Sequence, residues 1–134
     1  ALSDFNRAIE INPNYAEAYN NRGAAYAQQE KDDLALSDFN RAIEINPNYA
    51  EAYGNRGAAY AQQEKDDLAL ADFNRAIKIN PNYADVYVNR GIIYARQEKN
   101  NLARNDWKNA KKLSQAQGDT SLAEKIDSFL KLLF

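Results

Sequence analysis

The chain repeats one 34-residue segment three times. Residues 1–34 recur at 35–68 with one change, Asn20 to Gly54, and again at 69–102 with ten changes. The motif Asn-Pro-Asn-Tyr falls at 12–15, 46–49 and 80–83. A period in this range predicts stacked supersecondary units rather than a globule with one central core. We therefore expect function to lie on the long surface that the stack creates.

Composition narrows the class of protein. A chain of 134 residues, 45% hydrophobic and 27% charged, is typical of one soluble folded domain. The net charge of −2 disfavours a nucleic-acid partner, which would require a dense excess of Lys and Arg. No run approaches the roughly 18 apolar residues of a membrane span, so we expect no membrane partner and a cytoplasmic location. Because methionine is absent, we expect the chain to be part of a longer protein.

Helix signals divide each repeat into two amphipathic segments. Asn14 with Glu17 has the spacing of a capping box at the start of the first segment. The same pair recurs as Asn48 with Glu51 and as Asn82 with Asp85. Asp32 and Asp33 offer a cap for the second segment, and Pro47 ends it. Each repeat is therefore predicted to be a helical hairpin.

One face of each segment carries the packing residues. Tyr19, Gly23 and Tyr26 share a face of the first helix, and Ala35 and Phe39 share a face of the second. Small residues such as the glycine and the alanine allow close helix crossing, while the aromatic rings fill the space beside them. The tyrosines could also form a stacking platform for bases or sugars, but the helical spacing favours core packing.

These positions resemble the tetratricopeptide repeat family. The signature positions are held in repeat 1 by Tyr19, Gly23, Tyr26, Ala35, Phe39, Ala42 and Pro47, and in repeat 2 by Tyr53, Gly57, Tyr60, Ala69, Phe73, Ala76 and Pro81. Repeat 3 has Tyr87, Gly91, Tyr94, Ala103, Trp107 and Ala110, and its proline is replaced by Gln115. The resemblance covers nearly the whole chain and implies an all-α right-handed superhelical solenoid of antiparallel helix hairpins. Before the glycine, Asn-Arg-Gly is similar to a recurrent bacterial variant of the repeat.

An arginine precedes the glycine in every repeat, at positions 22, 56 and 90, where the family usually has leucine. A row of guanidiniums could bind an anionic chain. Each repeat also supplies an acid beside its second-helix aromatic residue, at positions 4, 38, 72 and 106. We favour structural Arg–Asp pairing that holds the hairpins together.

The remaining face of the first helices is the candidate binding site. The resemblance implies that these positions line a concave groove, and we predict that it binds an extended peptide or partner segment. In repeats 1 and 2 they are Glu17, Asn20, Asn21, Ala24, Gln28, Glu51, Gly54, Asn55, Ala58 and Gln62, and in repeat 3 Asp85, Val88, Asn89, Ile92 and Arg96. Asn21, Asn55 and Asn89 hold one position in all three repeats. A carboxamide there could bind a peptide backbone through its donors and acceptor, or could bond to a neighbouring helix.

The groove lacks the basic residues with which some family members grip the acidic tails of heat-shock chaperones. Those positions hold Asn20, Gly54 and Val88, and then Ala24, Ala58 and Ile92. The predicted groove is instead acidic at one rim and more apolar toward repeat 3. It suits a peptide with a small apolar anchor and some basic character.

The composition disfavours catalysis. The chain has no histidine and no cysteine, which removes the commonest general base, the thiol nucleophile and most transition-metal ligands. We expect a protein-binding scaffold that is not an enzyme and carries no cofactor or metal. The alternatives are a non-catalytic segment of a larger enzyme and a purely structural spacer.

The two ends of the array depart from the repeat. We predict a half repeat at 1–15, full repeats at 16–49, 50–83 and 84–117, and a capping helix at 118–134. The last helix, expected from about Thr120 to Leu133, has Leu122, Ile126, Phe129, Leu130 and Leu133 on one side. At the other end, residues 1–11 match the second helix of a hairpin without its first helix. We expect weak self-association through the uncovered Leu2, Phe5 and Ile9.

Overall fold

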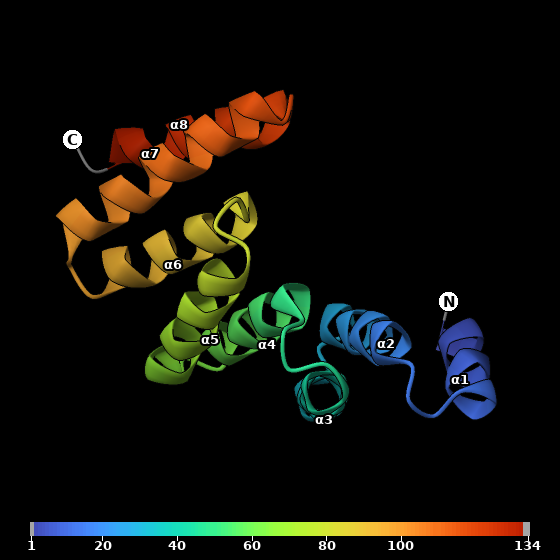
Figure 1. The fold of residues 1–134 in the computed structure, drawn as a ribbon. Coiled ribbons are helices and arrows are strands. Elements are labelled where there is room, and N and C mark those ends of the chain that lie inside the picture. The colour runs from blue at the N-terminus through green and yellow to red at the C-terminus, as the bar shows by residue number, and fades with distance from the viewer. Residues whose placement is uncertain (1, 133–134) are drawn as a thin grey trace. The chain divides into compact units, whose positions relative to one another are not determined.

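The computed structural model describes residues 2–132, which form eight α-helices and no strand (Figure 1). The helices are α1 (Leu2–Ile11), α2 (Ala16–Gln28), α3 (Asp32–Ile45), α4 (Ala50–Gln62), α5 (Asp66–Ile79), α6 (Ala84–Arg96), α7 (Asn100–Ala116) and α8 (Thr120–Leu132). They fall into two compact units, which meet between Ile79 and Asn80 in the sequence. Ala1, Leu133 and Phe134, which belong to the predicted terminal segments, lie outside the described residues.

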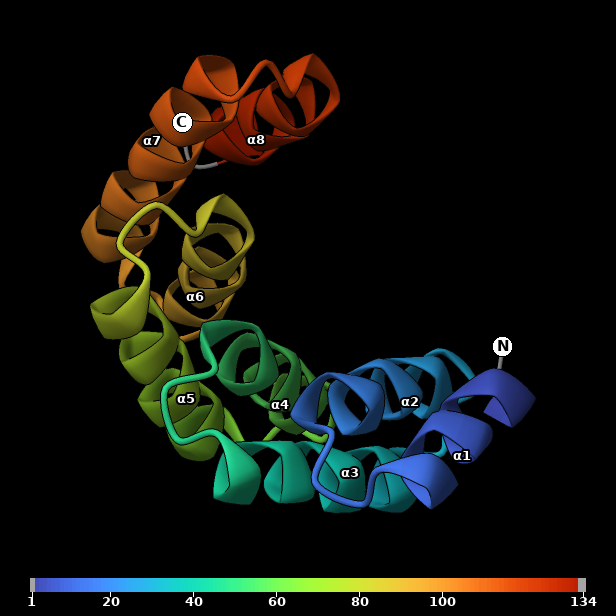
Figure 2. The same ribbon diagram turned by 45° about the vertical axis from the view of Figure 1, so that its right-hand side comes forward.

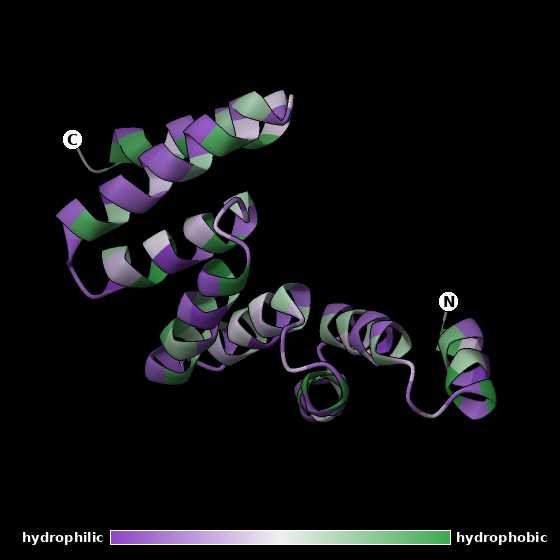
Figure 3. Ribbon diagram, in the orientation of Figure 1, coloured by the Kyte–Doolittle hydropathy of each residue, from purple (hydrophilic) through white to green (hydrophobic). Residues whose placement is uncertain are grey.

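Unit 1 contains helices α1 to α5. Helix α2 packs on α3 and α4 packs on α5, so each predicted repeat forms a hairpin (Figure 2). The hairpins stack through contacts of α3 and α2 with α4, and α1 packs on α2. Hydrophilic and hydrophobic residues alternate around each helix, as amphipathic packing requires (Figure 3).

The hairpin core is a close contact between a glycine and an aromatic ring. A Cβ added to Gly23 would lie 2.7 Å from Cε1 of Phe39, and one added to Gly57 would lie 2.6 Å from Cε1 of Phe73. Both rings are buried, and Ala35 is fully buried beside the first. The predicted role of the glycine in close helix crossing is confirmed.

The turn before each first helix differs from the predicted capping box. Helix α2 begins after Tyr15, and no side chain caps it, so Asn14 is not the cap. Instead the Asn14 backbone N–H donates to Oδ1 of Asn12 at 3.1 Å. The same bond joins Asn48 to Asn46 and Asn82 to Asn80. The proline disfavours helical geometry in the asparagine before it, whose side chain then bonds across the proline as an Asx turn.

The predicted caps of the second helices are also wrong. Asp32 and Asp33 lie within the first turn of α3, and the cap position belongs to Lys31. At these positions the two carboxylates stabilise α3, because they lie at the positive N-terminal end of the helix macrodipole. The turn before it contains Glu30 at φ 60°, a left-handed conformation that recurs at Glu64 and Glu98. Lys31 N–H bonds to the carbonyl oxygen of Tyr26 at 2.9 Å and so closes the end of α2.

Unit 2 contains α6, α7 and α8. Helix α6 packs on α7, and α7 packs on α8. Helix α7 has 17 residues where α3 and α5 each have 14. The sequence explains the difference, because Gln115 replaces the proline that ends the other second helices.

Helix α8 covers the apolar side of α7, as the sequence predicted. Gly118 has φ 76°, and the carboxylate of Asp119 accepts the Leu122 N–H at 3.0 Å, which caps α8. Ile126 is fully buried in a cluster that includes Trp107, and the rings of Trp107 and Phe129 stack at 5.3 Å.

We predict that Gly57→Ala lowers the free energy of unfolding by about 1–2 kcal/mol. Overpacking against Phe73 costs about 1–3 kcal/mol, and the better helix propensity of alanine returns up to about 1 kcal/mol. Gly91→Ala should cost more, because its Cβ would lie 2.5 Å from Nε1 of Trp107, which is held by a bond to the Val88 carbonyl oxygen. Urea denaturation followed by circular dichroism measures both variants. Equal stability of both variants and the unchanged chain would contradict the packing account.

Candidate functional site

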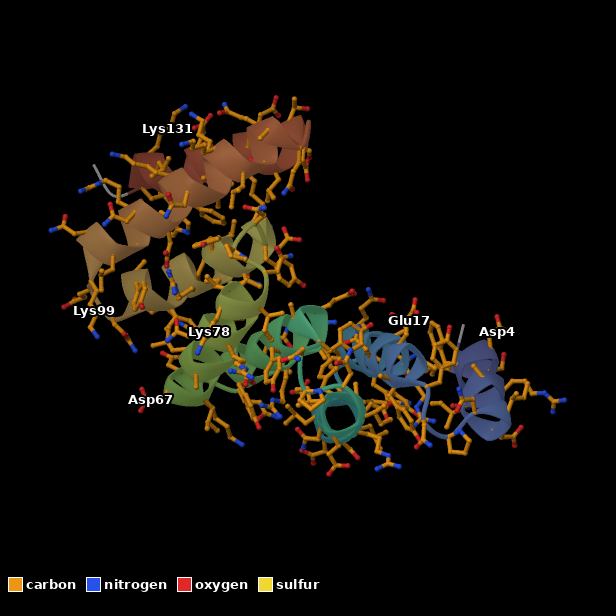
Figure 4. The ribbon with its side chains drawn as sticks, viewed as in Figure 1. Asp4, Glu17, Asp67, Lys78, Lys99 and Lys131 are labelled. Carbon is orange, nitrogen blue, oxygen red and sulfur yellow. The ribbon has the colours of Figure 1, made fainter. Side chains whose placement is uncertain are left out.

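The first-helix surface of unit 1 contains most of the predicted groove residues. Glu17 and Gln28 on α2 and Glu51 and Gln62 on α4 are exposed. The side chain of Glu17 projects from α2 (Figure 4). Asn21, Ala24, Asn55 and Ala58 are half-buried on the same two helices. This surface is polar and acidic, with amide groups between the acidic rim and the small alanines.

Asn20 does not belong to this surface. Its exposed fraction is 0% because α4 packs over it. Its Nδ2 lies 3.4 Å from the Tyr49 hydroxyl oxygen, and its Oδ1 accepts the Asn55 Nδ2–H at 3.0 Å. Asn20 is therefore a buried link between two hairpins and cannot contact a ligand.

The asparagine ladder divides into two kinds of position. Asn55 donates to Asn20, which is the neighbouring-helix alternative considered for this position. Within residues 2–132, Asn21 and Asn89 make no side-chain hydrogen bond, and both are half-buried. Their carboxamides therefore retain free donors and acceptors.

The expected apolar end of the groove, at Val88 and Ile92 in unit 2, is mostly buried. Val88 is only 4% exposed and belongs to the cluster of Trp107 and Ile126. Ile92 is half-buried against that cluster. Most of the predicted apolar surface is therefore used by the core that α8 completes. Asp85 and Arg96 remain exposed on α6 beside Asn89.

The arginines form the structural pairs that the sequence favoured. Arg56 donates from Nε and Nη2 to the two carboxylate oxygens of Asp72, at 2.8 and 2.7 Å. Its Nη1 donates to Oδ1 of Asn40 on the preceding second helix at 2.9 Å. Arg22 repeats this pattern with Asp38 and Asn6. One guanidinium thus joins its own hairpin and the helix before it.

Two tyrosine rings flank each of these guanidiniums. Cζ of Arg56 lies 5.6 Å from the ring centre of Tyr53 and 5.9 Å from that of Tyr60. Both rings are half-buried, so the predicted core packing of the tyrosines takes the form of cation–π contact with arginine. Arg90 repeats the arrangement in unit 2, between Tyr87 and Tyr94.

Three residues of these networks, Asn6, Asn40 and Tyr49, were not predicted from the sequence. Asn6 and Asn40 recur one residue after Phe5 and Phe39, and this 34-residue recurrence was the available signal. Tyr49 belongs to the Asn-Pro-Asn-Tyr turn, and burial, followed by the nearby Glu51, raises the pKa of its hydroxyl. The pKa of Arg56 is raised by its hydrogen bonds to Asp72, against a smaller desolvation effect. Since that pKa is raised, the contribution of the arginine to stability persists until strongly alkaline pH.

We predict that Arg56→Ala lowers the free energy of unfolding by about 2–4 kcal/mol, because it leaves Asp72 buried without its cation. The double variant Arg56→Leu/Asp72→Leu should recover most of this loss, since apolar replacement of a whole buried pair is often neutral or stabilising. Denaturant titration measures both.

Arg41→Ala is the matched control for this prediction. Arg41 and Glu44 form an exposed pair on α3, with an Nη1–Oε2 distance of 3.1 Å, so its loss should cost under about 1 kcal/mol. If Arg56→Ala cost no more than Arg41→Ala, the structural role of the buried pair would be wrong.

Comparisons with known proteins identify the class of this stack of helix hairpins. A model described as tetratricopeptide repeat matches residues 16–49 and 50–83. A TPR repeat model matches residues 1–30, and another tetratricopeptide repeat model matches 73–123. The chain belongs to the tetratricopeptide repeat family. No curated protein sequence matches it.

Solved structures have the same fold. The TPR2B domain of yeast Sti1, in a complex with pHsp70, is 24% identical, with a TM-score of 0.83 over 88% of this chain and 94% of that one. The Arabidopsis OM64 TPR domain is 22% identical, with a TM-score of 0.77 over 89% and 96%. MamA is 19% identical, with a TM-score of 0.73 over 98% and 84%. The expected all-α helical solenoid is confirmed.

Among residues 2–132, no three or more acidic, histidine or cysteine side chains gather where they could hold a metal ion. None of the helices described there combines the length and the apolar character needed to cross a membrane.

Proposed function

We propose that the chain is a protein-interaction scaffold whose first-helix surfaces bind an extended peptide or partner segment. The observation that carries this proposal is a half-buried carboxamide in each unit, Asn21 on α2 and Asn89 on α6, and neither has a side-chain hydrogen-bond partner within residues 2–132. A carboxamide can bond to a peptide N–H and C=O together, whatever the peptide side chain. The TPR2B domain of Sti1, solved with pHsp70, supports the proposal as a similar fold that holds a partner.

The chemistry of the surface selects the kind of peptide. Glu17 and Glu51 in unit 1 and Asp85 in unit 2 are exposed acids, while Ala24 and Ala58 leave room for small side chains. Basic residues are missing where a clamp for acidic tails would need them. The proposed ligand is therefore a segment with basic residues and a small apolar anchor.

We also propose a setting for this function. The protein is cytoplasmic and bacterial, and this chain binds its partner without catalytic activity of its own. A segment that serves a larger enzyme, or a spacer, is the competing account. Screening a random peptide library against the purified chain tests the proposal, because a spacer would recover no peptide of consistent chemistry.

For the strongest synthetic peptides from that screen, we predict that Asn21→Ala weakens binding to the first-helix surface of unit 1, and Asn89→Ala binding to that of unit 2, about 2-fold to 13-fold each. Each lost hydrogen bond is worth about 0.5–1.5 kcal/mol. Asn55 is left unchanged, because its substitution would also break the bond to buried Asn20. Isothermal titration calorimetry measures the affinities. Asn105→Ala, on exposed second-helix surface, is the control, and an affinity equal to that of this control would remove the substituted asparagine from its site.

We also propose weak self-association through α1. Phe5 on α1 is half-buried, whereas the equivalent Phe39 on α3 is 1% exposed. A single helix face is small compared with the roughly 1,000 Å² of specific stable interfaces, so the contact should be weak. Phe5→Gln should abolish concentration-dependent sedimentation, and Leu34→Gln, at an exposed leucine of α3, should not. A monomeric unchanged chain at every concentration would refute the proposal.

A further inference from the structure

The first tyrosine of a repeat contacts two arginines in repeats 1 and 2 but one arginine in repeat 3. In repeat 1 the ring centre of Tyr19 lies 5.6 Å from Cζ of Arg22 and 5.9 Å from Cζ of Arg41 on the second helix. In repeat 2, Arg56 and Arg75 contact Tyr53 at the same two distances. Each of these rings is therefore covered by two guanidiniums.

Repeat 3 lacks the second guanidinium. Asn109 occupies the position that corresponds to Arg41 and Arg75. Within the described residues, Tyr87 makes a cation–π contact with Arg90 only, at 5.5 Å. The Tyr87 hydroxyl donates to the Pro81 carbonyl oxygen at 3.1 Å, which fixes the ring. The shorter Asn109 side chain thus leaves part of a held aromatic ring uncovered.

A pocket occupies this place in unit 2. Its volume is about 330 Å³, at the lower end of the range for small-ligand sites. The lining residues are Pro81, Tyr87, Asn109, Lys112, Leu113 and Ala116. Ala116 belongs to the extra turn of α7, which exists because Gln115 replaces the proline of the earlier repeats. Two sequence departures of repeat 3, at 109 and 115, therefore contribute to one pocket.

The charge of α7 indicates what the pocket would accept. Helix α3 has one basic and four acidic residues, a net −3, and α5 has two basic and three acidic residues, a net −1. Helix α7 has four basic residues and one acid, a net +3. That acid is Asp106, which pairs with Arg90, and Lys111 pairs with Asp127 on α8. Lys108 and Lys112 are exposed and form no ion pair within residues 2–132.

We propose that this pocket of unit 2 binds an acidic peptide segment, with one leucine-sized apolar side chain of the partner against Tyr87 and Leu113 and a carboxylate beside Lys112. This second-helix site is distinct from the first-helix surface proposed above. The apolar walls supply the burial energy, and the unpaired lysines supply charge complementarity. An arginine of the partner could replace the missing guanidinium, but the positive charge of α7 disfavours a second cation there.

The test uses a fluorescein-labelled synthetic peptide with one leucine between two pairs of glutamates, followed by fluorescence anisotropy. Replacing the leucine by serine should weaken binding about tenfold or more, since burial of a leucine is worth about 1.5–3 kcal/mol. Replacing the glutamates by glutamines should weaken it about 2-fold to 5-fold for each ion pair lost, and less at high salt. A peptide with arginine in place of leucine should bind more weakly.

Asn109→Arg is the decisive variant, because it restores the arginine found at positions 41 and 75. It should fill the pocket and weaken peptide binding at least about tenfold, without loss of helicity or thermal stability. Lys112→Glu, at an exposed position, is a second variant that should weaken binding, while Lys125→Glu on α8 is the matched control with the same charge change. Asn21→Ala/Asn89→Ala should leave this binding unchanged, so failure here is separate from failure of the first-helix site.

Several results would overturn the proposal. They are absence of peptide binding at millimolar concentration, equal binding of the leucine and serine peptides, tighter binding of the arginine peptide, and unchanged affinity in Asn109→Arg. Equal losses in Lys112→Glu and Lys125→Glu would also overturn it, because they would indicate attraction to net charge rather than to this pocket.

Discussion

The bidentate Arg–Asp pair is the interaction on which each hairpin depends. In repeat 2, the guanidinium of Arg56 bonds to Asp72 on its own second helix and to Asn40 on the previous one, with tyrosine rings beside it. Burying an arginine is costly unless its donors are satisfied, and here three of its nitrogens have oxygen partners. The position that is usually leucine in the family thus holds a polar connector that fixes both the hairpin angle and its distance from the preceding helix.

These contacts of the arginines determine which side chains of the first helices are available to bind a ligand. The guanidiniums of Arg22 and Arg56 form hydrogen bonds inside unit 1. The first-helix surface of unit 1 is therefore left with amides, small residues and exposed acids. The side chain of Asn20 is also unavailable to a ligand, because it bonds to Asn55 and lies near Tyr49. A polar residue on a repeat surface is therefore not evidence of a ligand site until its intramolecular partners are known. That criterion separates Asn21 from Asn20, although the two are adjacent in the sequence.

The fold could be predicted because repetition fixes helix length, and the glycine and alanine positions fix which faces meet. The Arg–Asp pairs could also be predicted, since both members recur beside buried residues. The helix caps could not, because an asparagine before proline competes successfully for the backbone N–H that the capping box would have used. The left-handed Glu30, Glu64 and Glu98 gave no residue-type signal, since glycine or asparagine is usual there. The burial of Asn20 and Val88 could not be predicted from their own repeats. Asn20 is covered by α4 of the next repeat, and Val88 lies in the cluster that α8 completes.

The third repeat shows which constraints are strict. It keeps the glycine at 91, the alanines at 103 and 110, and the Arg90–Asp106 pair, all of which are buried or hydrogen-bonded. Its second helix replaces the buried phenylalanine by Trp107, but most of its changes lie at exposed or half-exposed positions, where it gains lysines and loses the arginine over the tyrosine. Packing tolerates these changes because Tyr87 is still held by Arg90 and by Pro81. A repeat array can therefore acquire a new surface in one unit without altering the contacts that stack it, and unit 2 has done so around Tyr87.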